Sequence, residues 1–376
     1  MKDYIIVYSC LYPYNFPPSF YYDYAKSLAH YTHEVIYIDL YSTKSDKKWW
    51  FGYYQLFKTV RNLLMNKPGI WIYIPKVGKF SNQILKLYLL IKKYFFSKKI
   101  VFYTMNSFSD PIYNYIPADK KVFDCLDRRE SEFENNKKLI EEFDLILVAN
   151  RLLQGQLKDI NPNRVKVIPT GYTKGNFKNY SFVKVRNISG SVVFFGGISH
   201  RLDFELLYKV MNKLRRVGFY FIGEEYLNVY YKDKNDFKLF TEWKRIKKLP
   251  NCYYLGKMDK EVYKKLLSSF SVGIIPYSTD DIFNYYSYPM KLFDYLLARL
   301  PVVSTDIPNV KIHSKVFPIF IAKDWREFVN HINKQIKKGS LVSTNSIRKF
   351  YKYHHMKNKI KFVDKYLQSL FLNYPN

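Results

Sequence analysis

Short runs of hydrophobic residues recur along the first half of the chain, and stretches with helical periodicity separate many of them. Short apolar runs bounded by polar or turn residues are typical of buried strands. We assign strands to residues 4–8, 34–39, 70–74, 100–103, 121–124, 145–148 and 165–168, and a helix to residues 20–31. Strands that alternate with helices predict a parallel sheet with both faces covered.

The same pattern restarts at Val192 and continues through strand-like runs near Phe219, Tyr253, Val272 and Val302. A polar, glycine-marked linker over residues 171–191 separates the two halves. A chain of 376 residues is long for one core and suits two domains. We therefore predict an α/β fold of two units, with ligands bound beyond the carboxyl ends of the strands, in a cleft between the units. Residues 349–372 also have helical character.

One segment of the second half, residues 287–306, combines a Pro-x-Lys turn, a helical stretch and a strand. Pro289 and Lys291 stand at the start of the helical stretch. A helix N-terminus attracts anions, and it disfavours a lysine in its first turn unless an anion lies between them. The pattern predicts a phosphate site at Lys291, although an ordinary solvent-facing lysine fits the same spacing.

A second segment, residues 192–203, has the pattern of a strand, a glycine turn and a helix. Gly196 and Gly197 would let the backbone approach a ligand closely. Arg201 can donate two hydrogen bonds to phosphate oxygens. A plain turn between a strand and a helix would look the same.

These two segments resemble signatures of GT-B glycosyltransferases. Residues 289–303 resemble the nucleotide-sugar signature P-x-K-x-x-E-Y-L-A-x-G-x-P-V-V, and residues 196–203 are similar to the G-x-x-x-x-R-x-D turn of a subgroup that builds bacterial surface polysaccharides. Residues 221–224, 251–256 and 271–277 resemble further segments of the same donor domain, in the same order.

The resemblance implies the GT-B architecture, in which two Rossmann-like domains face each other across a cleft. Residues 1–175 would bind the acceptor and residues 185–354 the nucleotide sugar, with the final helix, about residues 355–376, packing back on the first domain. Lys291 would hold the donor diphosphate. Asp294 stands where the family has the glutamate that holds the ribose. The donor-binding residues expected by this resemblance are Gly196, Gly197, Arg201, Gly223, Leu255, Tyr288, Pro289, Lys291, Leu292 and Asp294.

Candidate acceptor residues follow two strands of the first half. Asp124 and Asp127 lie in a segment that resembles the Y-D-x-x-D motif of the same subgroup, and Asn106 and Asp110 follow the preceding strand. We expect these four residues to bind the acceptor, with Asp127 as the group that accepts the proton of its hydroxyl. Asp127 is equally suited to cap the following helix. The catalytic residues predicted are Asp127, Lys291 and Arg201.

The composition shows that the chain is strongly basic. The chain has 61 Lys and Arg against 32 Asp and Glu, a net charge of +29, which predicts attraction to nucleic acid, an anionic lipid surface or an acidic sugar phosphate. No zinc-finger or RNA-binding pattern is present, so we expect no nucleic-acid partner. Cys10, Cys125 and Cys252 are far apart, which favours a reducing compartment. No His, Cys, Asp or Glu spacing predicts a metal.

Two segments of the first half combine basic residues with large apolar ones, residues 47–51 and 84–99. The second contains Lys92, Lys93, Lys98 and Lys99 beside leucines and aromatic residues. Such a mixture suits an anionic membrane interface. A core helix with a solvated lysine edge fits it as well. No apolar run is long enough to span a bilayer.

We therefore expect a cytoplasmic glycosyltransferase, peripheral on the inner face of the plasma membrane, that works in bacterial cell-surface glycan synthesis. It would use no metal or other cofactor. The co-substrate would be a nucleotide-diphosphate sugar, with a UDP-sugar favoured, and the acceptor a lipid-linked glycan or polysaccharide. The alternatives are a sugar-nucleotide epimerase on the same scaffold, a basic nucleic-acid-binding protein and a non-catalytic sugar-nucleotide-binding protein.

Overall fold

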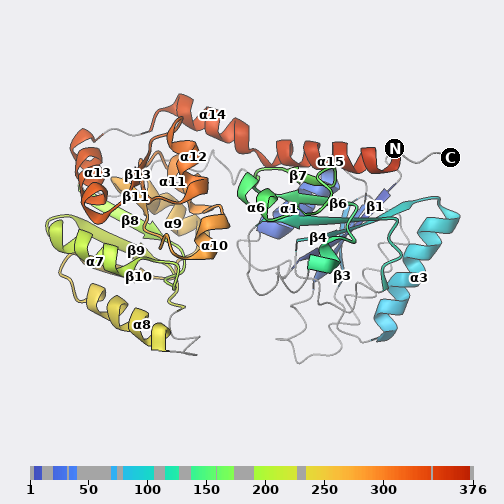
Figure 1. Cartoon of the computed structure of the whole chain (residues 1–376), viewed down its shortest axis with the longest axis horizontal. Helices are drawn as coiled ribbons and strands as arrows, with labels where there is room; N and C mark the ends of the chain where they lie inside the picture. The colour runs from blue at the N-terminus through green and yellow to red at the C-terminus, as the bar shows by residue number, and fades with distance from the viewer. Residues whose placement is uncertain are drawn as a thin grey trace. The chain divides into compact units, whose positions relative to one another are not determined.

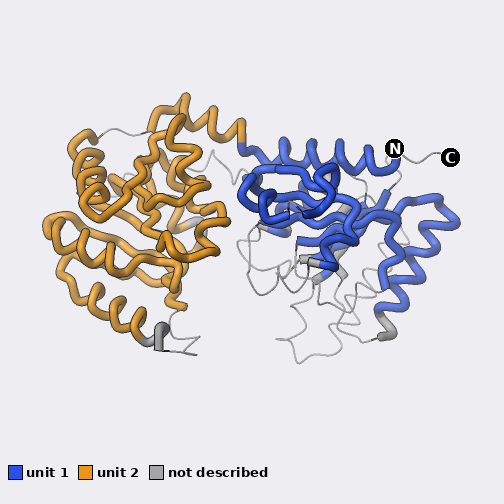
Figure 2. The backbone as a smooth tube through the Cα atoms, viewed as in Figure 1, with its two compact units in different colours: residues 1–173, 354–376 blue, residues 174–353 orange. Residues whose placement is uncertain are grey.

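The chain folds into two compact units. The computed structural model describes residues 4–10, 20–31, 34–39, 69–73, 79–105, 115–126, 137–157, 159–172, 190–226, 234–339 and 342–372. Unit 1 comprises residues 1–173 and 354–376, and unit 2 comprises residues 174–353 (Figure 2).

Unit 1 is built on a parallel sheet of seven strands in the order β3-β2-β1-β4-β5-β6-β7 (Figure 1). The strands are β1 (Tyr4–Cys10), β2 (Glu34–Asp39), β3 (Gly69–Tyr73), β4 (Lys99–Thr104), β5 (Lys120–Cys125), β6 (Leu145–Val148) and β7 (Val165–Val167). The helices are α1 (Phe20–Tyr31), α3 (Lys79–Phe95), α5 (Lys137–Ile140), α6 (Arg151–Gln156) and α15 (Met356–Leu372). Each run that the hydrophobic pattern assigned to a strand in this half is a strand.

Unit 2 repeats this plan with a parallel sheet of six strands in the order β10-β9-β8-β11-β12-β13. The strands are β8 (Ser191–Phe195), β9 (Gly218–Ile222), β10 (Cys252–Gly256), β11 (Val272–Ile275), β12 (Val302–Thr305) and β13 (Ile319–Ala322). The helices are α7 (Phe204–Lys213), α8 (Lys234–Lys247), α9 (Lys260–Leu267), α10 (Ile282–Tyr286), α11 (Lys291–Leu297), α12 (Pro308–Ser314), α13 (Trp325–Lys338) and α14 (Thr344–His354).

The helical tail is divided in two, whereas its sequence has helical character throughout. The break between α14 and α15 falls at His355, which forms a parallel bridge with Tyr172. The N–H of Tyr172 donates to the carbonyl of His354 at 2.8 Å, and the N–H of Met356 donates to the carbonyl of Tyr172 at 3.0 Å. These two bonds fix the point at which the chain enters α15, which then runs beside α1 (Figure 1).

Helix α15 completes the core of unit 1. Its residues Met356, Ile360, Val363 and Leu367 follow helical spacing and are buried against the side chains of β1, β2, β4 and α1. The strands beneath have buried residues on both faces, as a parallel sheet requires. The end of the chain is therefore part of the first folding unit.

An ion pair lies inside this contact between α15 and the sheet. The ammonium of Lys359 is 3.1 Å from Asp124 Oδ2, and the two side chains are 1% and 0% exposed. The hydroxyl of Tyr103 donates to the same carboxylate at 2.5 Å and shares a 2.6 Å hydrogen bond with the hydroxyl of Tyr24. Burial, reinforced by the charge of Asp124, raises the pKa of both tyrosines well above the usual value, so both hydroxyls stay neutral.

This placement corrects the prediction that Asp124 faces an acceptor. Its carboxylate points into the core toward α1 and α15, where Lys359 and Tyr103 bind it. The partner that decides this orientation lies 235 residues further along the chain. Asp124 therefore links β5 of the sheet to the C-terminal helix α15 within unit 1.

We predict that Lys359→Met lowers the free energy of unfolding by about 3–5 kcal/mol, because it leaves the buried carboxylate of Asp124 without its counter-charge. Lys361→Met, on the exposed side of the same helix, is the matched control and should change stability little. Urea unfolding followed by circular dichroism measures both. Equal midpoints for the two variants would show that the Lys359–Asp124 pair contributes nothing to stability.

Candidate functional site

The loop after β8 brings two strand ends of unit 2 into backbone contact. Gly196 has φ +123°, and its N–H donates to the carbonyl of Ile222 at 2.8 Å. Gly223, after β9, has φ +155°, and a Cβ atom there would lie 2.0 Å from the carbonyl oxygen of Gly196. Both positions therefore require glycine. A Cβ atom on Gly197 would meet the ring of Tyr226 at 2.7 Å, so this residue is also closely covered.

Lys291 is the first residue of α11, and its side chain lies against this glycine loop. A Cβ atom on Gly196 would be only 3.1 Å from Lys291 Nζ. The ammonium lies over two aromatic rings, 3.8 Å from the centre of Phe194 and 4.5 Å from that of Tyr277. The residue is 8% exposed. The lysine selected from the Pro-x-Lys turn is therefore buried, in contrast to an ordinary solvent-facing lysine.

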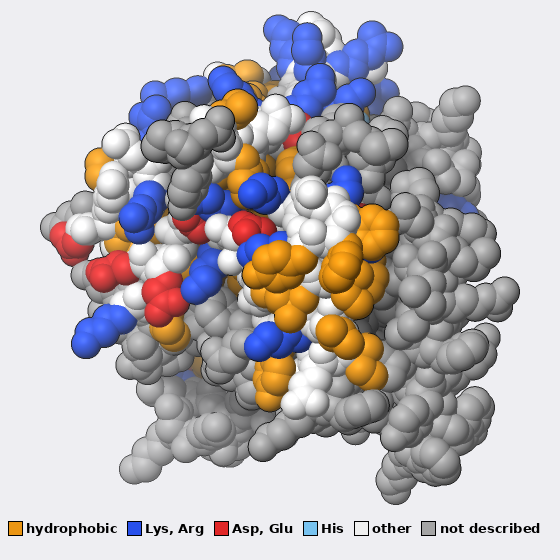
Figure 3. Space-filling view, turned by 90° about the vertical axis from the view of Figure 1, so that its right-hand side faces the viewer, with side chains coloured by type: hydrophobic (Ala, Val, Ile, Leu, Met, Phe, Trp, Pro, Cys, Tyr) orange, Lys and Arg blue, Asp and Glu red, His pale blue; other side chains and the backbone are white. Residues whose placement is uncertain are grey.

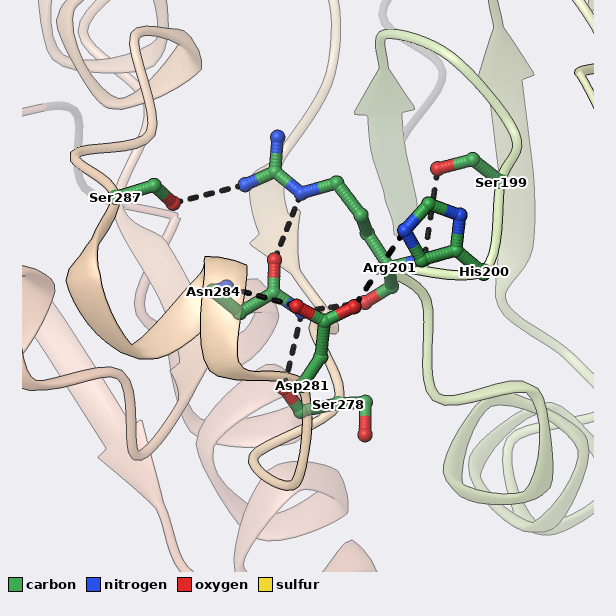
Figure 4. A network of polar contacts seen from close by, with 7 residues as sticks. All are labelled: Ser199, His200, Arg201, Ser278, Asp281, Asn284 and Ser287. Atoms are coloured by element: carbon green, nitrogen blue, oxygen red, sulfur yellow. Dashed lines mark hydrogen bonds and ion pairs between the residues drawn. The ribbon is translucent and has the colours of Figure 1, made fainter. Parts of the chain in front are cut away.

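Arg201, from the same loop, is fixed by hydrogen bonds (Figure 4) and also lies over two aromatic rings. Its Nε donates to Asn284 Oδ1 at 2.7 Å, and Nη2 donates to Ser287 Oγ at 3.0 Å. The guanidinium lies 4.4 Å from the ring centre of Tyr277 and 4.5 Å from that of Phe283. Its position is therefore set before any ligand binds. Tyr277 contacts both cations.

Asn284 holds this arrangement together. It is fully buried, and its Nδ2 donates to the carbonyls of Arg201 at 2.9 Å and Ser278 at 3.0 Å (Figure 4). Its N–H donates to the carboxylate of Asp281, the N-cap of α10, at 3.0 Å. Asp281 in turn lies 3.6 Å from the imidazole of His200. No motif in the sequence pointed to Asn284. Its one sequence feature is that it stands three residues after the capping Asp281.

Among the described residues, no carboxylate forms an ion pair with either of these two basic side chains, Lys291 and Arg201. Burial, with a further contribution from the charge of Arg201, lowers the pKa of Lys291 well below its usual value. Two fixed basic side chains in this arrangement favour a ligand with several anionic oxygens.

Asp294 has a different environment from Lys291, although both lie on α11. Its carboxylate is 3.4 Å from the ammonium of Lys264 of α9, and both side chains are buried. The negative charge of Asp294 is therefore balanced by Lys264 within unit 2. Contact of Asp294 with a ribose stays a prediction.

The other predicted donor residues lie around this loop and turn. Tyr288 packs on Phe293 and His313, and the side chain of Leu292 is fully buried. The carbonyl of Pro289 accepts the N–H of Leu292 at 3.0 Å, which shapes the turn before Lys291. Leu255 of β10 is 40% exposed. Contact of these four residues with a donor stays a prediction.

Three predicted residues of the first half, Asn106, Asp110 and Asp127, lie outside the described residues. Their acceptor-binding and catalytic roles stay predictions. The structure thus brings together Gly196, Gly223 and the two cations in unit 2, whereas Asp124 belongs to the core of unit 1.

Comparison with known proteins provides independent information on the class of protein that this chain is similar to. No family model matches the chain. The chain is 24% identical over 215 residues to TuaH, a proposed teichuronic acid biosynthesis glycosyltransferase of Bacillus subtilis (strain 168). The match covers 51% of each chain, so this chain spans about half the length of the curated relative.

Solved structures match the chain over almost its whole length. Anabaena Alr3699/HepE in complex with UDP has a TM-score of 0.65 at 14% identity, covering 98% of this chain and 100% of that one. Sucrose-phosphate synthase from Thermosynechococcus elongatus has a TM-score of 0.66 at 11% identity, covering 99% and 100%. A glycosyltransferase from Rickettsia africae has a TM-score of 0.66 at 10% identity, covering both chains fully. The fold is GT-B, with two Rossmann-like domains, and the predicted fold class is confirmed.

We predict that Lys291→Met stabilises the ligand-free protein and weakens its binding of UDP. Removing an uncompensated buried charge should raise the free energy of unfolding by about 1–4 kcal/mol. Because burial lowers the folded-state pKa of Lys291, its protonated form opposes folding. The gain should be largest below that folded-state pKa and shrink as the pH rises toward the ordinary lysine pKa.

Urea unfolding at several pH values and UDP titration by calorimetry measure the two effects. Lys315→Met, which removes an exposed lysine of unit 2, is the control and should alter neither quantity. A loss of stability in Lys291→Met together with unchanged UDP binding would mean that Lys291 serves the fold alone.

We predict that Gly223→Ala disrupts the glycine loop. The added methyl group would meet the carbonyl of Gly196, and relieving that contact should cost about 1–3 kcal/mol and displace Lys291. Gly155→Ala is the control, because nothing lies within 4 Å of its Cβ position in α6; it should be neutral or stabilise by up to about 1 kcal/mol. Urea midpoints and UDP affinity test this, and equal affinities in the two variants would contradict it.

Proposed function

We propose that this protein is a glycosyltransferase that moves a sugar from a nucleotide-diphosphate sugar, preferably a UDP-sugar, to an acceptor. The observation that carries the proposal is that two fixed basic side chains, Lys291 and Arg201, lie beside a glycine loop, with no carboxylate of the described residues paired to either. The name of TuaH describes a glycosyltransferase, and HepE was crystallised with UDP. The UDP in the HepE complex supports a nucleotide-diphosphate ligand for this chain, and we propose that it binds at this loop.

The charge that develops in the reaction explains why two fixed cations would accelerate it. The bond between the anomeric carbon and the diphosphate oxygen breaks, and its electron pair stays on the diphosphate. Lys291 and Arg201 would stabilise this charge, and their fixed positions reduce the reorganisation needed during the reaction. The acceptor hydroxyl oxygen bonds to the anomeric carbon, and its proton passes to a base, for which Asp127 is the predicted residue.

The same two residues would act in place of a metal ion. Binding of a diphosphate next to Lys291 would restore the lysine pKa toward its usual value, so the ammonium would be charged when the donor is present. We propose that transfer needs no metal, because Lys291 and Arg201 would stabilise the leaving diphosphate themselves.

The acceptor we propose is a lipid-linked glycan or a growing polysaccharide of the bacterial cell surface. The support is the name of TuaH, which refers to teichuronic acid biosynthesis. Among the described helices, none is both long enough and apolar enough to cross a membrane. Work on a lipid-linked acceptor would then take place with the protein attached to the inner face of the plasma membrane.

A thermal-shift panel of UDP-, GDP-, ADP- and dTDP-sugars, followed by a transfer assay with the labelled donor that binds, tests the proposal. We expect stabilisation by a UDP-sugar, loss of this stabilisation in Lys291→Met, and transfer that persists in EDTA. A sugar nucleotide that binds but is only epimerised or left unchanged in the presence of lipid and glycan acceptors would contradict transferase activity. Complete, metal-reversible loss of transfer in EDTA would contradict the role given to the two cations.

A further inference from the structure

A stripe of large apolar side chains lies exposed on α3. It consists of Leu87, Ile91, Tyr94, Phe95 and Phe96, which are 58%, 41%, 73%, 82% and 58% exposed. The helical residues among them are spaced so that they share one face of the helix. Helix α3 lies on the outside of unit 1 (Figure 1), and Figure 3 shows hydrophobic side chains gathered on this side of the molecule, with Lys and Arg and also Asp and Glu side chains around them.

The opposite side of α3 already anchors the helix. Leu85 and Leu89 are buried, and the hydroxyl of Tyr88 donates to the carboxylate of Glu34 at 2.6 Å. The exposed stripe is therefore not needed to hold α3 on the sheet. Large apolar groups concentrated on one face mark an interaction surface.

Two lysines of this segment, Lys92 and Lys93, form ion pairs within unit 1, which corrects the expectation that they face an anionic membrane. Lys92 is buried, and its ammonium lies 3.7 Å from Glu34 Oε2. The ammonium of Lys93 lies 2.6 Å from Asp119 Oδ1. The lysines exposed on and next to α3 are instead Lys86 and Lys99. One face of α3 therefore packs on unit 1, as expected for a core helix. The other face is exposed, as a membrane-binding helix would require.

The chemistry of the stripe favours an anionic lipid surface over a protein partner. Residues 79–95 contain no Asp or Glu, and the whole chain carries a net charge of +29. Three consecutive aromatic residues, Tyr94 to Phe96, lie at the end of α3 and directly after it, just before the lysines at 98 and 99. Aromatic rings and lysines side by side are typical of the level at which lipid headgroups meet acyl chains.

We infer that α3 lies in the headgroup region of an anionic bilayer and attaches unit 1 to it through Leu87, Ile91 and Phe95. Insertion of these side chains supplies binding that resists salt, and Lys86 and Lys99 add attraction that salt weakens. The inference does not depend on the proposed transferase activity, because none of the residues assigned to the donor lies on α3.

The test compares vesicle binding by the full chain and by Leu87→Gln/Ile91→Gln/Phe95→Gln. Glutamine keeps helix propensity and removes the apolar groups. The matched control, Val262→Gln/Ile312→Gln/Val316→Gln, removes three exposed apolar side chains of unit 2. Sedimentation uses vesicles of phosphatidylcholine alone and vesicles that also contain phosphatidylglycerol. Circular dichroism and UDP binding establish that each variant is folded.

We expect the parent chain and the unit 2 control to bind the anionic vesicles equally, and the α3 variant to bind about tenfold or more weakly. Lys86→Ser/Lys99→Ser should lower binding in dilute salt and leave the salt-resistant part. Equal binding by all variants would overturn the inference. So would an α3 variant that alters only the self-association of the chain, measured by light scattering, because the stripe would then join two copies.

Discussion

The structure of unit 2 is organised around two basic side chains, Lys291 and Arg201, which no carboxylate of the described residues pairs with. Removing an ammonium from water is unfavourable unless a counter-charge compensates it. Lys291 is buried beside Gly196 and close to Arg201. The glycine loop, the rings of Phe194 and Tyr277, and the amide of Asn284 all hold the cations in place. The surrounding residues of unit 2 hold these two basic side chains in place although their burial is unfavourable. Their hydrogen-bond donors are suited to the oxygens of a diphosphate.

Unit 1 contains the opposite arrangement, which shows that burial alone does not identify a functional lysine. Lys359 is even less exposed than Lys291, but it is paired with Asp124, whose carboxylate also accepts a hydrogen bond from the neutral hydroxyl of Tyr103. Its charge is satisfied, and its effect is to fasten the last helix to the first sheet. A buried lysine with a carboxylate thus serves the fold, and one without a carboxylate is a candidate for ligand binding.

Local sequence patterns predicted most of the elements, because apolar runs in a parallel sheet are continuous and easily recognised. Helix α1 and strands β2 and β6 have the bounds that the pattern predicted. What the sequence did not predict are the contacts between distant segments. The orientation of Asp124 depends on Lys359, and the roles of Lys92 and Asn284 depend on Glu34 and Arg201. Sequence motifs identified Lys291 and Arg201, but only the structure showed that neither forms an ion pair with a carboxylate in the described part of the chain.

The central claim is that Lys291 is a buried basic group whose missing counter-charge a diphosphate supplies. It is tested most directly by the number of protons that the protein takes up or releases when UDP binds. Calorimetric titrations at mildly alkaline pH, in buffers with different ionisation enthalpies, give this number. We expect UDP binding to take up protons, because the anion raises the lowered pKa of Lys291, and we expect the uptake to disappear in Lys291→Met. UDP binding without proton uptake, or with the same uptake in both proteins, would contradict it.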